Sequence, residues 1–183
     1  MKAETLLAQR RAQQVTIPTD RFVLRPPRRS DAGLIAHYVA DRRVAEGTTS
    51  IPHPLPPGVV DAFLTRVTAP DRTEDAWVID ASGHGGDEVL GLVSLKRMDR
   101  GQSELSYWVA PAFWNAGIAS AAVTALVQAN PTGARTLFAC VFQDNPASAR
   151  VLTHAGFQYL GDAESYCVAR GATAPTWTYL RRM

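Results

Sequence analysis

The sequence predicts a single α/β domain built around a mixed β-sheet. The chain has 183 residues, a length that fits one domain and buries roughly two-thirds of the surface of the unfolded chain. Its hydrophobic content of 46% and charged content of 20% are ordinary for a globular protein. Strand patterns come first as a meander and later alternate with helix patterns, which requires both antiparallel and parallel pairing.

The N-terminal part contains an arm, a strand and a helix. We expect residues 1–18 to form an arm or short helix, with the domain spanning 19–183. The first strand is Phe22–Pro26, which two successive prolines end. Ser30 is expected to cap a helix from Asp31 to about Arg42, because apolar residues there recur at helical spacing.

A loop, a second helix and a meander follow. Residues 47–58 contain four prolines, which neither a helix nor a central strand accommodates. Residues 59–67 have a helix pattern. Residues 76–79 and 89–95 form a predicted hairpin around a glycine-rich turn, and the alternating segment 102–109 adds a further strand.

Helices and strands alternate in the C-terminal half. The segment 117–128 has a strong helix pattern, which Asn-Pro ends, and 136–142 is an apolar strand of the buried type. The next predicted helix is 145–154, and the last two strands are 165–170 and 177–180.

Composition excludes several classes of protein. The formal net charge is only +2 and the arginine pairs are scattered, so we expect no direct binding of nucleic acid. The N-terminus has no continuous apolar segment, and no stretch approaches the ~18 residues of a membrane span, so a cytoplasmic protein is expected. Cys140 and Cys167 have no metal-type spacing to another ligand; we interpret them as small hydrophobic residues and expect no metal.

The segment Tyr107–Ser120 is the first that indicates chemistry. It combines a strand, a tight loop and the first turn of a helix made of small residues. The free N–H groups at such a helix start bind phosphate. A larger side chain at Gly117 or Ala119 would hold a pyrophosphate away from the backbone, although the same pattern also suits a helix that packs closely on a sheet.

The segment Ala139–Phe157 is the second segment that indicates chemistry. It consists of a strand, a turn that starts at Asn145, a short helix and Gly-Phe. Asn145 by itself indicates a helix N-cap. Its spacing to Ser148 and to Gly156, downstream of the first segment, is what favours a functional interpretation.

Together the two segments resemble the GNAT superfamily of acetyltransferases, and more closely its RimJ/RimL-like branch. The branch pattern Trp-x-x-Gly-x-Ala is similar to Trp114–Ala119. Its Asn-x-x-Ser, followed by Gly-Phe, is similar to Asn145, Ser148 and Gly156-Phe157. Residues 19–25, 51–55 and 166–171 also resemble the branch, so that the likeness covers 19–183. It implies a GNAT fold, with a mixed, mostly antiparallel sheet of six to seven strands flanked by about four helices.

The resemblance also implies a cosubstrate, acetyl-CoA, and the residues that bind it. Val109 would supply backbone groups to the pantetheine arm and the thioester carbonyl. The remaining acetyl-CoA-binding residues implied by the resemblance are Trp114, Asn115, Ala116, Gly117, Ile118, Ala119, Ser120, Asn145 and Ser148. The sequence departs from the family pattern at Asn115-Ala116 and at Ala121, which leaves the backbone N–H groups in place.

Two catalytic residues follow from the same resemblance. Glu104 lies on the strand that leads into the cofactor loop, where a glutamate of the family often serves as general base, directly or through water. Strand parity places it on one face with Ser106 and Trp108. Leu152 occupies the place of the family's frequent tyrosine, so Ser148 is expected to protonate the leaving thiolate. The rival bases His37 and His53 more readily fit a surface or a helix face.

The resemblance implies acetyl transfer to a primary amine, either a small molecule or a protein N-terminus. The acceptor would bind near residues 30–66, with the proline-rich loop as a lip. Three alternatives stay open: a non-catalytic acyl-CoA-binding module, transfer of a larger acyl group such as succinyl, and a ribosome-associated protein with a vestigial cofactor site. Whether the domain forms a homodimer also stays open.

Overall fold

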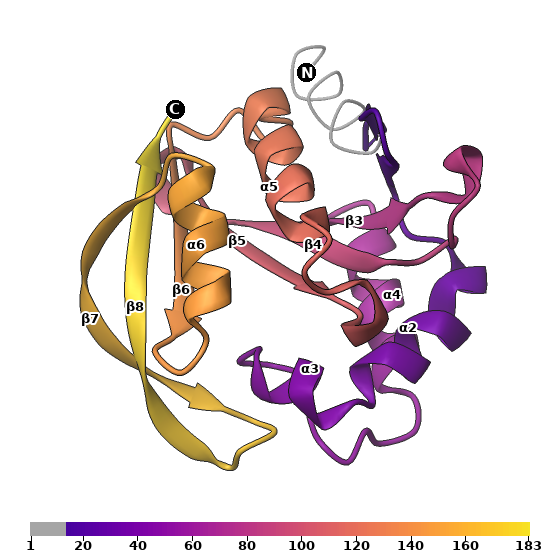
Figure 1. Ribbon diagram of the computed structural model, residues 1–183, viewed down its shortest axis with the longest axis horizontal. Coiled ribbons are helices and arrows are strands. Elements are labelled where there is room, and N and C mark those ends of the chain that lie inside the picture. The colour runs from indigo at the N-terminus through magenta and orange to yellow at the C-terminus, as the bar shows by residue number, and fades with distance from the viewer. Residues whose placement is uncertain (1–13) are drawn as a thin grey trace.

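The computed structural model describes residues 14–183, and within them one eight-stranded sheet lies between helices (Figure 1). The strands are β1 Ile17–Pro18, β2 Val23–Arg25, β3 Glu74–Asp80, β4 Gly91–Arg97, β5 Gln102–Val109, β6 Thr136–Phe142, β7 Gln158–Cys167 and β8 Ala172–Arg182. The α-helices are α2 Ala32–Val39, α3 Arg42–Glu46, α4 Val59–Thr68, α5 Ile118–Ala129 and α6 Pro146–His154. None of these helices has the length and apolarity needed to cross a bilayer.

The strand order across the sheet is β1-β2-β3-β4-β5-β6-β8-β7. Neighbouring strands of the described chain run antiparallel except β5 and β6, which are parallel. The helix α5 provides the crossover between these two strands, as parallel neighbours require. The predicted mixed, mostly antiparallel α/β architecture is therefore confirmed.

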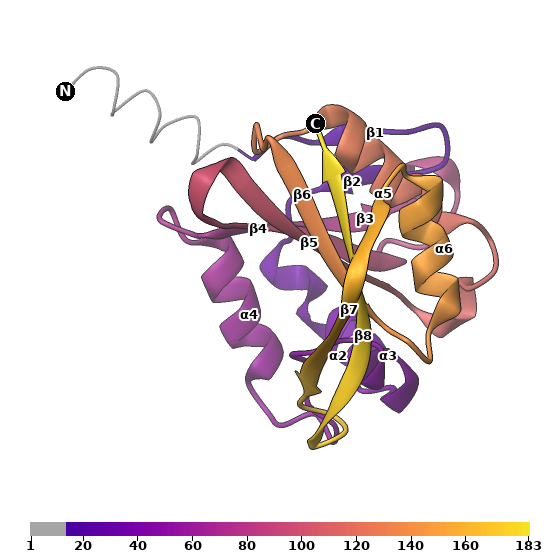
Figure 2. The same ribbon diagram turned by 90° about the vertical axis from the view of Figure 1, so that its left-hand side faces the viewer.

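Helices cover both faces of the sheet (Figure 2), and a hydrophobic core lies on each face. Helices α5 and α6 pack on one face, and α2, α3 and α4 contribute to the core on the other. Strand β3 serves both cores, because successive side chains of a strand point to opposite faces. Trp77 and Ile79 enter the first core, while Ala76 and Val78 enter the second.

The structure differs from the prediction at several element boundaries. The short strand β1, which pairs with β2, adds an eighth strand and draws Ile17–Pro18 out of the predicted arm 1–18 and into the sheet. Residues 1–13 of that arm lie outside the described residues. Strand β7 begins at Gln158 rather than 165, because it pairs with β8 along its whole length despite its exposed side chains.

The prediction for the first helix was wrong in its cap and its end. Ser30 lies in a 3₁₀ turn, and helix α2 starts at Ala32 with Asp31 at its N-cap. The side chain of Asp31 is instead held by Arg25 and by the backbone N–H of Arg28. The chain then forms the separate helix α3, whose N-cap Asp41 accepts a hydrogen bond from the backbone of Arg43.

A buried ion cluster fixes the first helix to the sheet. The Arg25 guanidinium donates to Asp80 over 2.5 Å and to both oxygens of Asp31 over 2.8 and 2.9 Å. All three residues are at least 95% buried, with exposed fractions of 4%, 5% and 1% for Arg25, Asp80 and Asp31. Burial alone would raise the pKa of Asp80, but hydrogen bonds from Arg25 and Ser82 outweigh it and lower that pKa. Arg25 and Asp80 therefore form an ion pair at neutral pH.

Replacing Arg25 with Met should lower the free energy of unfolding by about 3–5 kcal/mol, because two buried carboxylates lose their cation. Urea unfolding followed by circular dichroism measures this. The matched control is Arg42→Met, which breaks an exposed pair with Glu46 and should change stability by less than about 1 kcal/mol. Equally small effects of the two substitutions would show that the buried ion cluster of Arg25 does not stabilise the fold in this way.

Candidate active site

Strands β5 and β6 are neighbours over only part of their length. They pair from Gln102–Thr136 to Glu104–Phe138, and beyond this point each strand pairs only with its other neighbour. β5 continues against β4 as far as Val109, and β6 continues against β8 as far as Phe142. The two strands therefore diverge and leave a gap in the middle of the sheet.

The backbone of β5 presents polar groups without a strand partner to this gap. Met98 N donates to Gln102 O and Ala110 N donates to Leu90 O, so even-numbered residues turn their backbone groups toward β4. By the same alternation, the N–H and C=O groups of Tyr107 and Val109 point away from β4, into the gap where β6 has separated from β5. Backbone groups without a strand partner need another partner. For the carbonyl oxygen of Val109 this partner is the Trp114 indole N–H, and for the other groups a ligand in the gap would supply it.

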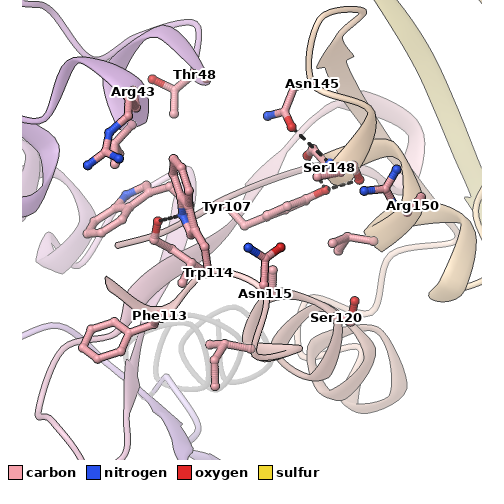
Figure 3. Close-up of a pocket in the computed structure, with 18 of the residues that line it drawn as sticks. Arg43, Thr48, Tyr107, Phe113, Trp114, Asn115, Ser120, Asn145, Ser148 and Arg150 are labelled. Atoms are coloured by element: carbon pink, nitrogen blue, oxygen red, sulfur yellow. Dashed lines mark hydrogen bonds between the residues drawn. The ribbon is translucent and has the colours of Figure 1, made fainter. Parts of the chain in front are cut away.

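A cavity of about 650 Å³ occupies the gap (Figure 3). Both Tyr107 and Trp108 line it, although these consecutive residues lie on opposite faces of β5. Tyr107 packs against the α5/α6 core and Trp108 against the α2/α4 core. The cavity thus connects the two faces of the sheet.

The structure brings most of the predicted site residues together around this cavity. Those that line it are Val109, Trp114, Asn115, Gly117, Ile118, Ala119, Ser120, Asn145 and Ser148. Ala116 does not line it; its carbonyl oxygen accepts a hydrogen bond of 2.9 Å from Arg21, which braces the loop from outside.

The start of α5 forms one end of the cavity. Gly117 at the N-cap has φ of +73°, a left-handed conformation that glycine adopts without strain, and no side chain caps the helix. The first intrahelical bond runs from Ala121 N to Gly117 O, so that the amides of Ile118, Ala119 and Ser120 have no helical partner. These donors and the positive end of the helix dipole favour an anion here.

Trp114 connects the loop before α5 to the opposite side of the cavity. Its indole N–H donates to the carbonyl oxygen of Val109 over 2.7 Å. The Arg43 guanidinium, held by Asp41, lies 5.4 Å from the centre of the Trp114 ring. Figure 3 shows Arg43 and Trp114 side by side at this wall of the cavity.

The start of α6 forms the wall facing β5. The side chain of Asn145 accepts a hydrogen bond from Ser148 N over 3.2 Å, the N-cap interaction that the sequence predicts. Tyr107 reaches across from β5, and its hydroxyl lies 2.7 Å from Ser148 Oγ and 2.9 Å from Ser148 O. Burial raises the pKa of Tyr107, which keeps it a phenol.

Arg170, in the turn between β7 and β8, joins three elements at the far end of the cavity. It donates to the carbonyl oxygen of Glu46 over 2.8 and 3.1 Å and forms two hydrogen bonds with Asp144, of 2.7 and 3.1 Å. Its guanidinium also lies 4.6 Å from the centre of the Phe142 ring. The same turn contacts the segment after α3 a second time, where Val168 N donates to Thr49 O.

Glu104 lies apart from the cavity. It shares a face of β5 with Trp108, but it is not among the residues that line the cavity. At about 3.3 Å per residue, the Cα atoms of Glu104 and Trp108 are ~13 Å apart along the strand. His37 and His53 do not line the cavity either, whereas His154 does.

Sequence reasoning missed several lining residues, among them Tyr107, Arg43, Arg150, His154 and Arg170. Tyr107 was detectable in principle, because it lies on the strand that leads into the cofactor loop. Arg150 lies on α6 two residues after Ser148, and His154 follows one turn later. Arg43 and Arg170 come from segments far away in sequence, and no local pattern indicates that they meet here.

The chain belongs to the GNAT acetyltransferase family. The model of the acetyltransferase (GNAT) domain matches residues 21–158, as the sequence resemblance predicted. No protein of curated function matches the chain by sequence.

Solved structures of RimJ and RimL have the same fold. RimL, a ribosomal L7/L12 α-N-protein acetyltransferase solved with coenzyme A, is 17% identical, with a TM-score of 0.79 over 92% of this chain and 98% of its own. RimJ of Mycobacterium smegmatis, solved with CoA-disulfide, is 22% identical, with a TM-score of 0.75 over 93% and 88% of the two chains. The spermidine N-acetyltransferase of Vibrio cholerae, solved with CoA and spermine, is 16% identical, with a TM-score of 0.75 over 90% and 96%.

Replacing Arg170 with Met should loosen the segment after α3. Amide hydrogen exchange at Gly47 and Thr48 should accelerate by about 10-fold, because the Glu46 carbonyl loses charged donors. Arg42→Met is the control, since it removes a contact with the side chain of the same Glu46 outside the cavity. Unchanged exchange at Gly47 and Thr48 in the Arg170 variant would contradict the anchoring role.

Proposed function

We propose that the protein transfers an acetyl group from acetyl-CoA directly to a primary amine, on a protein N-terminus or a small molecule. The observation that carries this proposal is the cavity that passes through the sheet between β5 and β6. A donor bound from one face and an acceptor bound from the other would meet in this gap. Holding two reactants in such a geometry supplies much of the rate acceleration of a transfer reaction.

The residues at the α5 end suit the phosphates of acetyl-CoA. The uncapped amides of Ile118, Ala119 and Ser120 are donors for a pyrophosphate. Arg150 and His154, one helical turn apart on α6, line the cavity as well, and the Arg150 guanidinium adds positive charge. The backbone groups of Tyr107 and Val109 that face the gap would pair with the amides of the pantetheine arm, as a neighbouring strand would.

Two side chains are proposed to act on the reacting groups. Glu104 would take the proton of the attacking amine, and its position outside the cavity means that it acts through water. Ser148 would donate a hydrogen bond to the leaving sulfur, since it lines the cavity opposite β5. A well-placed base typically contributes about 10²–10⁴-fold to the rate.

The acceptor is expected at the end of the cavity formed by α3 and the β7–β8 turn. Its lining carboxylates, Glu46 and Asp144, are already held by Arg42 and Arg170, respectively. RimL acts on a ribosomal protein and the Vibrio cholerae enzyme on spermidine, so an N-terminus and a small amine both remain candidates. Transfer of a larger acyl group, or acyl-CoA binding without turnover, are the alternatives that an acyl-donor and amine screen distinguishes.

The base assignment predicts that Glu104→Gln lowers kcat by about 100-fold while the Kd of acetyl-CoA is unchanged. Turnover is measured as CoA release with the best amine from a screen, and the Kd by calorimetry. Glu46→Gln tests the rival carboxylate inside the cavity, and Glu164→Gln is an exposed strand control. If Glu46→Gln lost activity while Glu104→Gln stayed active, the general base would be Glu46 on α3, and the assignment of Glu104 would be contradicted.

A further inference from the structure

The hydroxyl of Tyr107, which is hydrogen-bonded to Ser148, has no role in the reaction as described so far. The two side chains come from different elements, β5 and α6, that face each other across the cavity. Their oxygens are 2.7 Å apart, and the Tyr107 hydroxyl also lies 2.9 Å from the carbonyl oxygen of Ser148. Both distances are those of hydrogen bonds between well-placed partners.

Counting protons determines the direction of these bonds. The Tyr107 hydroxyl has one proton, and the carbonyl oxygen of Ser148 can only accept. When Tyr107 donates to the carbonyl, the Ser148 hydroxyl must donate to Tyr107, and its proton points away from any ligand. When Tyr107 donates to Ser148 Oγ instead, the Ser148 proton is free to point into the cavity.

We propose that Tyr107 is the positioning residue of the leaving-group site, because it determines whether the Ser148 hydroxyl can donate to the sulfur. This inference rests on the proposed acetyl transfer. During that reaction the N–C bond forms, the C–S bond breaks and its electron pair stays on sulfur. The growing charge on sulfur draws the Ser148 proton toward itself, and Tyr107 then rotates its own proton from the carbonyl to Ser148 Oγ.

The acidities of the groups show that the two hydroxyls donate hydrogen bonds and keep their protons. An alkyl thiol has a pKa of about 8.5 and an ordinary tyrosine of about 10. Burial raises the pKa of Tyr107, and its hydrogen bond with Ser148 offsets this only in part. A thiolate is therefore too weak a base to remove the phenolic proton. The nitrogen gives its proton to the general base, and the released thiolate takes one from solvent.

A chain of two hydroxyls stabilises the thiolate better than one. A hydroxyl that accepts a hydrogen bond is polarised and becomes a stronger donor. The pairing with Tyr107 also holds Ser148 Oγ on the side of the cavity that faces β5, which limits the loss of side-chain entropy in the transition state. The position of Leu152, where the family often has a tyrosine, is consistent with this arrangement, since the phenol comes here from β5.

The test uses Tyr107→Phe, Ser148→Ala and the double variant, with Tyr179→Phe as the control. Tyr179 lies in the same core, and no hydrogen bond of its hydroxyl to Ser148 occurs among the described contacts. We expect Tyr107→Phe to lower kcat by about 10-fold with the KM for acetyl-CoA unchanged. The double variant should be no slower than Ser148→Ala, because the two hydroxyls act as one unit.

A second readout does not depend on turnover. The pKa of the thiol of bound CoA, followed by the ultraviolet absorbance of the thiolate, should rise by about one unit in Tyr107→Phe and in Ser148→Ala. A wild-type thiol pKa and kcat in Tyr107→Phe, together with impaired Ser148→Ala, would overturn the inference. Absence of any acetyl-CoA-dependent turnover in the wild-type protein would instead overturn the proposed function.

Discussion

The divergence of β5 and β6 is the constraint on which the rest of the structure depends. Each of the two strands is held by its other neighbour, β5 by β4 and β6 by β8, well beyond the point where they separate. Gly91 permits a close approach at the critical place, because a Cβ atom there would lie 2.3 Å from the carbonyl oxygen of Trp108. β4 therefore holds the end of β5 firmly on the side away from the gap.

In addition to the hydrophobic cores, a few long-range contacts hold the elements around the gap in place. Trp114 and Arg43 connect the loop before α5 to α3, and Arg170 connects α3 to the start of α6. Asp144, which Arg170 holds, directly precedes the Asn145 cap, and this cap orients the helix that bears Ser148. The Arg170 guanidinium thus connects the end of α3 to the start of α6 across the cavity.

Much of this architecture could be predicted from the sequence. The small residues from Gly117 to Ser120 and the Asn145–Ser148 spacing indicate two helix starts, and the structure places both at the same cavity. These signals are local, because a helix start is specified by adjacent residues. The mixed sheet was predictable as well, from the change between a meander and a helical crossover.

What the sequence does not reveal are the contacts that depend on strand register and on distant segments. The partner of Tyr107 cannot be predicted from the strand on which it lies, because only the approach of α6 brings Ser148 to its hydroxyl. Arg170 follows β7. The side chains of β7 are mostly exposed, so the sequence shows no hydrophobic pattern from which the long pairing of β7 with β8 could be predicted. Strand parity alone could not show that Glu104 lies outside the cavity, since that depends on where β6 separates from β5.

The central claim is that the gap between β5 and β6 binds the pantetheine arm of acetyl-CoA, and a thermal-shift comparison of acetyl-CoA with ATP tests it most directly. ATP offers adenosine and phosphates but lacks the arm. At ~100 times its Kd, acetyl-CoA should add roughly 2.7 kcal/mol to the stability and raise Tm by about 5–11 °C, with little or no shift from ATP. No shift with acetyl-CoA, or an equal shift with ATP, would contradict the claim.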